Sequence, residues 1–278
     1  MVQIINCVEL AKNTISSVHA NIVKHNLKLK LVVIMIGNSQ PSLIYIKNKI
    51  KVCRELGIET DFVQLESNIT YEEIKSIIDQ YNNNPEVSGI LVQLPLPESL
   101  QPYQQQILDL ISAKKDVDGL TSTNQANLLQ NNTQGYIPCT TLGILKILDS
   151  LNINLEGSRA LVIGRSLLVG VPTFLSLNNR NATATLAHYY TKNLSELAKQ
   201  SDIIISAVGK ANLITADMIK EGSIIIDVGI VRIGNQLTGD VSKDVERSSA
   251  KYLTTVPNGV GKMTVASLIH NLYISHQY

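Results

Sequence analysis

The stretch Gly89-Ile-Leu-Val-Gln-Leu-Pro-Leu-Pro97 indicates both how the chain folds and where it acts. Residues 90–92 are apolar on both faces of a strand, which is typical of a parallel sheet covered by helices. Gln93 follows at the carboxyl end of that strand, where open α/β sheets bind their ligands. Because Pro95 and Pro97 cannot continue a ladder, the chain must leave the sheet as a rigid loop. We therefore predict a functional side chain, Gln93, at the rim of a parallel sheet.

Short apolar runs alternate with helical patterns on both sides of this strand. Before residue 120, the pattern predicts strands at 31–36 and 58–65 and helices at 41–56, 70–81 and 103–110. Ser39 is a candidate cap and Gly57 a stop for the helix at 41–56, while Thr70-Tyr-Glu-Glu73 resembles a capping box. A second series follows, with a helix at 140–151 and strands at 160–163, 183–187, 203–208, 224–228 and 253–256. Such alternation implies parallel sheets with right-handed crossovers.

The length of 278 residues allows two domains with sizeable cores. Residues 121–135 are rich in Asn, Gln, Thr and Ser, and we predict a loop or connector there. We therefore predict an α/β fold of two lobes with parallel-rich sheets and a cleft between them, the second lobe being Rossmann-like. The first domain is expected at 1–118 plus 265–278, because the last helix, at about 264–275, can return to it. The second is expected at 119–264.

Composition excludes several classes of function. Apolar residues make up 44% of the chain, charged residues 17%, and the formal net charge is +1. No global field or basic run with interleaved aromatics favours nucleic acid, and no apolar run approaches a membrane span. Cys7, Cys53 and Cys139 are odd in number and form no C-x-x-C pair, so we expect buried thiols and no metal site. Without a signal-peptide pattern, a cytoplasmic protein is expected.

A candidate phosphate loop, Gly164-Arg-Ser-Leu-Leu-Val-Gly170, follows an apolar strand and opens a helix. A dinucleotide's pyrophosphate binds at such a place, although the spacing differs from G-x-G-x-x-G. The alternative is a tight turn with a surface arginine. Arg165 suits a 2′-phosphate, and the second strand ends on His188-Tyr189 without an acid for ribose hydroxyls. NADP is therefore favoured, and NAD stays possible.

Candidate catalytic residues lie on the 41–56 helix and on the Lys115-Asp-Val-Asp-Gly119 segment. Tyr45 and Lys49 are four residues apart and share a helix face. Lys49 is either a solvated lysine or an amine facing the cleft, where neutral Gln93 could orient it. Asp116 and Asp118 belong either to an Asp-Gly turn or to a carboxylate site for an amidine-like N–H pair, as in a pterin ring.

Taken together, these segments resemble the bifunctional methylenetetrahydrofolate dehydrogenase/methenyltetrahydrofolate cyclohydrolase family over nearly the whole chain. The resemblance rests on Tyr45-x-x-x-Lys49, Gly89–Pro97, Lys115–Gly119, Pro138-Cys-Thr140, Val162-Ile-Gly-Arg-Ser166, Asp227-Val-Gly-Ile230, Val256-Pro257 and Met263-Thr-Val-Ala266. It implies an oxidoreductase and hydrolase of one-carbon metabolism and purine biosynthesis, acting on tetrahydrofolate derivatives. The first domain would bind folate and the second NAD(P), and the family suggests a homodimer.

The resemblance also implies roles for individual residues. Lys49 would be the general acid/base of the hydrolytic step, Gln93 would tune and position it, and Tyr45 would pack on the folate rings. Asp116 would anchor the pterin, and Pro257 would border the folate. The residues that would contact NADP are Gly164, Arg165, Ser166 and Ile230.

The chain departs from the family pattern at a few positions. Thr141 replaces a second proline, and Tyr189 stands where other members carry a residue that helps to hold the 2′-phosphate. Asn258 replaces a glycine, which asparagine can do because it tolerates left-handed backbone, and Lys262 replaces a proline. Two alternatives follow: a variant that is mainly a dehydrogenase or uses NAD, and a non-catalytic folate- or nucleotide-binding paralogue. Lys49 and Gln93 argue against the paralogue.

Overall fold

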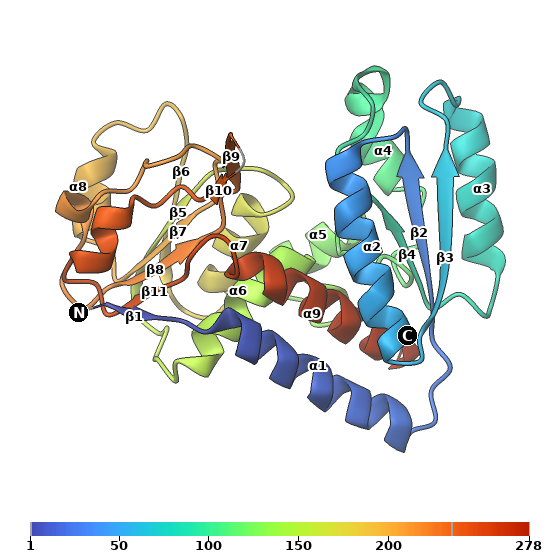
Figure 1. Ribbon diagram of the computed structural model, residues 1–278, viewed down its shortest axis with the longest axis horizontal. Coiled ribbons are helices and arrows are strands. Elements are labelled where there is room, and N and C mark those ends of the chain that lie inside the picture. Colours follow the sequence, from blue (N-terminus) through green and yellow to red (C-terminus); the bar gives the residue numbers. More distant parts are fainter. Residues whose placement is uncertain (1, 235, 278) are drawn as a thin grey trace. The chain divides into compact units, whose positions relative to one another are not determined.

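A computed structural model describes residues 2–234 and 236–277, and the chain divides into two compact units (Figure 1). Unit 1 contains the residues up to Asn13 together with Thr140–Ser267. Unit 2 contains Thr14–Cys139 and the residues from Leu268 on. Each unit has its own parallel sheet, so the predicted α/β fold with two parallel-rich sheets is confirmed. The predicted domain limits at 118/119 and 264/265 stay predictions.

The sheet of unit 2 carries β2 (Lys30–Ile36) between β3 (Glu59–Leu65) and β4 (Gly89–Val92), all parallel. β4 is buried along its whole length, as expected for a strand that is apolar on both faces. The connecting helices are α2 (Gln40–Glu55) and α3 (Tyr71–Asn83). Their predicted starts are confirmed. The Ser39 hydroxyl accepts the N–H of Ser42, and Thr70 forms a complete capping box with Glu73.

Two predictions in unit 2 are wrong in detail. The predicted connector at 121–135 contains a helix, α5 (Ser122–Leu129), which begins where the Thr121 side chain accepts the N–H of Asn124. Polar composition concealed this helix because its buried residues are Asn124 and Leu128, which form no apolar stripe, and its start is stabilised by capping. The helix predicted at 103–110 is a 3-10 turn, η1 (Glu98–Tyr103), followed by the short α4 (Gln104–Leu108).

In the described residues, the sheet of unit 1 has the order β1-β11-β8-β7-β5-β6, with every pair parallel. These strands are β1 (Gln3–Ile4), β5 (Arg159–Ile163), β6 (Thr183–Ala187), β7 (Ile203–Ser206), β8 (Ile224–Asp227) and β11 (Tyr252–Leu253). After β5 the chain adds β6 on one side and then crosses to β7 on the other. Ligands of open α/β sheets bind at such a switch point, outside the carboxyl ends of the strands.

Further elements complete the chain. The helices not yet given are α1 (Cys7–Lys24), α6 (Cys139–Ser150), α7 (Gly170–Asn178), α8 (Leu194–Lys199) and α9 (Val260–Ile274), the last beginning four residues before the predicted start. Short 3-10 turns occur at Ala216–Met218, Lys243–Arg247 and Ser275–Gln277. β9 (Val231–Ile233) and β10 (Gln236–Thr238) form a small antiparallel pair. The predicted burial of Cys7, Cys53 and Cys139 is confirmed.

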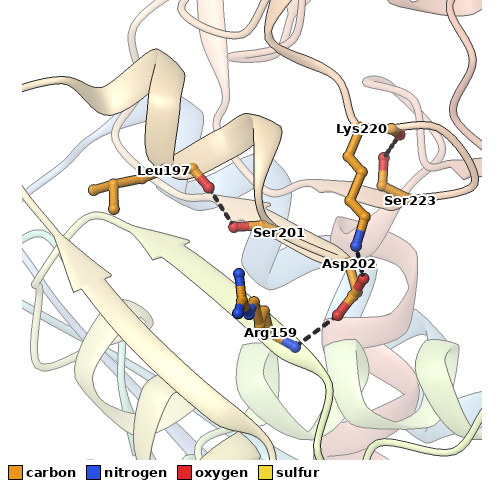
Figure 2. Close-up of polar contacts among 6 residues, drawn as sticks. All are labelled: Arg159, Leu197, Ser201, Asp202, Lys220 and Ser223. Atoms are coloured by element: carbon orange, nitrogen blue, oxygen red, sulfur yellow. Dashed lines mark hydrogen bonds and ion pairs between the residues drawn. The ribbon is translucent and has the colours of Figure 1, made fainter.

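Polar contacts tie together the amino edge of the unit 1 sheet (Figure 2). Asp202, just before β7, accepts the N–H of Arg159 at 2.8 Å and pairs with the ammonium group of Lys220. These contacts hold the pKa of Asp202 below its usual value. Nearby, Ser223 donates to the carbonyl of Lys220, and Ser201 donates to the carbonyl of Leu197. These contacts join neighbouring segments at the amino edge, whereas ligands of open α/β sheets bind at the opposite, carboxyl edge.

Candidate functional site

Lys49 and Gln93 meet in unit 2, as the sequence predicted. Lys49 lies on α2 with only 8% of its surface exposed, and its Nζ donates to Oε1 of Gln93 at 3.1 Å. Gln93 follows β4, and its Nε2 donates to the carbonyl of Leu94 at 2.7 Å. That second bond fixes the orientation of the amide, so an acceptor rather than a donor faces the lysine. Lys49 forms no ion pair within 4 Å in the described residues, so its partner is neutral.

Tyr45 lies one turn before Lys49 on the same face of α2. Its ring is 44% exposed, unlike Ile46, which is packed into the core of the unit. An exposed aromatic ring beside a buried amine offers a flat apolar surface to a planar ligand.

Asp116 fixes the loop at residues 116–121, and its backbone is bridged to Ile90 of β4. Its Oδ1 accepts the N–H of Gly119 at 2.9 Å, and its Oδ2 accepts the N–H of Thr121 and Nδ2 of Asn124, each at 2.8 Å. The side chain is 1% exposed. Burial raises the pKa of Asp116 to about 6, against the opposing effect of these hydrogen bonds. Both oxygens are therefore engaged in the chain's own loop.

Asp118, two residues on, has different surroundings. Its side chain is only partly buried, and its charge acts on the thiol of Cys139, as does the charge of Lys49. The Cys139 thiol donates to the carbonyl of Val117 at 3.2 Å, and burial raises its pKa well above the usual value. Asp118 is thus a partly buried carboxylate beside Cys139 that the sequence-based assignment left out. The segment Lys115–Gly119 contained it, but nothing in that segment ranks one aspartate above the other.

The predicted phosphate loop joins β5 to α7 in unit 1. Gly164 has φ +112°, and a Cβ there would lie 2.5 Å from the carbonyl oxygen of Ala207. Ser166 accepts the N–H groups of Val169 and Gly170 at 3.2 and 3.4 Å, which caps the start of α7. Within the described residues, the N–H groups of Arg165 and Ser166 have no hydrogen-bond partner, and both side chains are exposed. Free N–H groups and an arginine at a helix start fit a dinucleotide pyrophosphate.

The remaining predicted residues also lie in unit 1. Ile230 follows β8 and is 49% exposed. Pro257 is exposed, and its carbonyl accepts the Thr255 hydroxyl at 3.4 Å. Asn258 has φ +74°, so the expected left-handed turn is present. Tyr189, after β6, is 93% exposed.

The predicted site residues are thus divided between the units. Unit 2 holds Tyr45, Lys49, Gln93 and Asp116, whereas unit 1 holds Gly164, Arg165, Ser166, Ile230 and Pro257. The cleft predicted from the sequence stays a prediction. The described residues contain no group of His, Cys, Asp or Glu side chains that could hold a metal ion. None of the described helices combines the length and apolar character that crossing a membrane requires.

Family models account for most of the sequence. Residues 5–118 match the catalytic domain of tetrahydrofolate dehydrogenase/cyclohydrolase, and residues 138–278 match its NAD(P)-binding domain. The chain belongs to this family. Among individual members of the tetrahydrofolate dehydrogenase/cyclohydrolase family, the bifunctional protein FolD of Oceanobacillus iheyensis is 46% identical over 242 residues, which are 87% of this chain and 84% of that protein. FolD of Clostridium novyi is 40% identical, over 95% of this chain and 93% of that protein.

Solved structures of the family agree with this fold. FolD from Campylobacter jejuni superimposes with a TM-score of 0.95 at 37% identity, covering 100% of this chain and 99% of that one. FolD from Trypanosoma brucei, solved in complex with NADP cofactor and an inhibitor, gives a TM-score of 0.93 at 28% identity, covering 99% and 97%. The family resemblance predicted from the sequence motifs is therefore confirmed.

Proposed function

We propose that this chain carries out both reactions of its family, with Lys49 and Gln93 at the centre of the second. It oxidises 5,10-methylenetetrahydrofolate to the 5,10-methenyl cation with NADP and hydrolyses that cation to 10-formyltetrahydrofolate. The observation that carries the proposal is the buried Lys49 Nζ, which is held at 3.1 Å by a neutral amide in a member of this family.

In the hydrolytic step, Lys49 moves protons. Water adds to the methenyl carbon, and Nζ of Lys49 takes up one of the two protons of that water. The bond from that carbon to N5 then breaks as N5 receives this proton from Nζ, and the remaining hydroxyl proton leaves to solvent as the formyl carbonyl forms. A general acid/base must lie within hydrogen-bond reach of the atoms between which it moves protons, and the bond to Gln93 holds Nζ in place for this.

Gln93 positions the lysine without adding a charge. A carboxylate in its place would stabilise the ammonium form, whereas an amide oxygen orients Nζ with a weaker preference. The bond from Gln93 to Leu94 O keeps that oxygen directed at Nζ. The amide therefore fixes geometry, which contributes to catalysis as effective concentration.

For the oxidative step, NADP when bound supplies a two-electron acceptor. Gly164 allows close backbone approach, the free N–H groups of Arg165 and Ser166 would bind phosphate, and Ile230 would contact the cofactor. NADP rather than NAD is supported by the Trypanosoma brucei relative, which was solved with NADP, and by the exposed Arg165, whose guanidinium group suits a phosphate. Tyr45 and Pro257 are proposed to contact the folate.

The test is the Lys49→Met variant, assayed separately for hydrolysis of added methenyl substrate and for NADP reduction. We expect hydrolysis to fall by about 100-fold or more, as for loss of a general acid/base, while folate binding stays measurable. Lys47→Met is the control, because Lys47 is an exposed lysine on the same helix. Unchanged hydrolysis in the Lys49 variant would reject this role. The ratio of the two activities also decides whether the enzyme is mainly a dehydrogenase.

A homodimer in the cytoplasm is a further part of the proposal. The family resemblance supports the dimer, and the buried free thiols support a reducing compartment. Light scattering coupled to size-exclusion chromatography tests the dimer, and a mass equal to one chain at micromolar concentration would refute it.

A further inference from the structure

Asp240 is a buried carboxylate that the proposed chemistry does not use. It follows β10 in unit 1 and is 0% exposed. Its Oδ2 accepts the hydroxyl of Ser206 at 2.8 Å and the N–H of Val208 at 2.9 Å, and its Oδ1 accepts the N–H of Lys210 at 2.8 Å. All three donors belong to the carboxyl end of β7 and the loop at residues 207–210 that follows it.

The charge of Asp240 has no cationic partner. No ion pair within 4 Å involves it in the described part of the chain. Burying a carboxylate is costly unless hydrogen bonds compensate, and here the compensation comes entirely from neutral donors of one loop. The three donors converge on the two oxygens of Asp240 and fix the path of residues 207–210. A neutral side chain of similar size does not offer two such acceptor oxygens.

A second carboxylate holds Asp240 in place. Asp227, at the end of β8, accepts the N–H of Asp240 at 2.9 Å and the N–H of Val241 at 3.1 Å. A Cβ added at Gly229 would lie 2.0 Å from Oδ1 of Asp240, and one at Gly239 would lie 1.8 Å from Oδ2 of Asp227. Each carboxylate therefore packs directly on backbone that only glycine allows, which leaves both side chains little freedom.

The loop that Asp240 holds lies against the proposed cofactor contacts. A Cβ at Gly164 would meet Ala207 O at 2.5 Å and Cγ1 of Val208 at 3.2 Å, so the phosphate loop and residues 207–208 pack together. A Cβ at Gly209, where φ is +70°, would lie 4.0 Å from Ile230 O. The loop thus lies between β5 and β8 at the carboxyl edge, beside the switch point where ligands of open sheets bind.

We propose that Asp240 is a positioning residue for NADP binding, which acts by fixing the 207–210 loop against the phosphate loop and Ile230. This inference rests on the proposed assignment of Gly164, Arg165, Ser166 and Ile230 as cofactor contacts. Asp240 itself does not touch the cofactor. Its carboxylate sets the shape of the surface that does.

The test is Asp240→Asn, which keeps the size of the side chain but turns one acceptor into a donor facing other donors. We expect the Kd for NADP, measured by titration calorimetry, to rise by about tenfold, the scale of one lost buried hydrogen bond. Hydrogen exchange should become faster at the amides of Val208 and Lys210 in the protein without cofactor. Hydrolysis of added methenyl substrate, which needs no NADP, should change by less than about twofold on the same scale.

Asp244→Asn is the matched control, because Asp244 is an exposed aspartate nearby that accepts the N–H of Ala216 instead. It should leave the Kd for NADP unchanged. An unchanged Kd in Asp240→Asn would overturn the inference, as would a parallel loss of both activities. If that variant does not fold, Ser206→Ala removes one donor and carries the same test with a smaller increase in Kd.

The Arg165→Ala variant distinguishes failure of the positioning role of Asp240 from failure of the cofactor-site assignment. If it weakens NADP binding while Asp240→Asn does not, the positioning role fails and the cofactor site stands. If it leaves NADP binding unchanged, the assigned cofactor contacts themselves fail, and the inference about Asp240 falls with them.

Discussion

Asp116 and Asp118 are separated by one residue, yet the first uses both oxygens in hydrogen bonds to residues 119–124 and the second is partly exposed beside Cys139. A carboxylate that anchors a pterin needs an oxygen free for the ligand. The contacts of Asp116 therefore favour a role in holding the loop, and Asp118 is the better placed of the two to reach a substrate. The substrate role predicted for Asp116 stays a prediction.

Single amide replacements separate these roles. Asp116→Asn puts an NH₂ group against N–H donors, so we expect the free energy of unfolding to fall by about 1–3 kcal/mol. Asp118→Asn should leave stability within about 0.5 kcal/mol and raise the KM for folate or lower kcat. Urea unfolding and both activity assays measure these effects. An Asp116→Asn protein as stable as the wild type, with impaired folate binding, would instead support direct contact.

Asparagine supplies the left-handed backbone of this chain wherever glycine does not. Among the described residues, every non-glycine residue with positive φ is an asparagine: Asn26, Asn131, Asn152, Asn181, Asn193, Asn212 and Asn258. Asparagine reaches this region at lower cost than other residues that carry a Cβ. The abundance of this residue in the sequence therefore has a structural use at turns.

Asn152, an exposed residue with φ +51° just after α6, tests this directly. We expect Asn152→Ala to lower the free energy of unfolding by about 1 kcal/mol, because alanine has the steric cost of left-handed backbone without the local hydrogen bonds of asparagine. Asn152→Gly should be neutral or slightly stabilising. Urea denaturation of the three proteins decides the matter, and equal stability of the alanine and glycine variants would contradict it.

Among the helices, α3 depends on a lysine from a distant loop. Nζ of Lys115 donates to the carbonyls of Tyr81, Asn82 and Asn84 at 3.1, 2.8 and 2.6 Å. These groups lie at the end of α3, where carbonyls lack partners within the helix. The loop that carries Asp116 and Asp118 is thereby attached to the end of α3.

Lys115→Met should lower the free energy of unfolding by about 1.5–3 kcal/mol, the usual range for hydrogen bonds to a charged group. Lys75→Met, at an exposed position of α3, is the control and should change stability by less than about 0.5 kcal/mol. Thermal unfolding monitored by circular dichroism measures both. Equal melting temperatures for the two variants would show that the Lys115 contacts contribute nothing net.

Elements with local signals could be predicted from the sequence, and those that depend on tertiary contacts could not. The capping residues Ser39 and Thr70 lie within three residues of the groups that they bind, so the local sequence predicted the starts of α2 and α3. Helix α5 was missed because Asn124, which donates to Asp116 from inside it, has meaning only once the loop is folded. In the site, the pairing of Lys49 with Gln93 followed from strand position and helix periodicity, whereas the choice between two neighbouring aspartates required their partners.

For the whole molecule, buried carboxylates make stability depend on pH. Burial raises the pKa of Asp116 to about 6 and of Asp227 to about 7, both above their value in an unfolded chain. The folded state then holds protons that the unfolded state releases, so these two groups make the protein less stable as pH rises from about 4 to 7. Asp202 and Asp244, whose pKa values are lowered, act in the opposite sense, and their contribution is lost only at lower pH.

Replacing Asp227 by Asn removes one of these titrations. The free energy of unfolding of the wild type should fall more steeply between pH 4.5 and 7.5 than that of Asp227→Asn, whatever the difference in absolute stability. Urea unfolding at several pH values measures the slopes. The values should span the range from about 4, the ordinary pKa of an aspartate, to about 7, the pKa of Asp227 in the folded protein. Parallel profiles would mean that Asp227 titrates as it does in the unfolded chain.

The chain topology also constrains how the protein is made. β1 leaves the ribosome before any other described strand of its sheet, whereas its partner β11 leaves after all the others. The core of unit 2 likewise includes Leu268, Ile269 and Leu272 from the last helix. Unit 1 therefore cannot finish packing on a nascent chain until β11 emerges, and unit 2 cannot until the end of α9 emerges. Both units therefore complete their packing late in the synthesis of these residues, and until then their exposed apolar surface can aggregate.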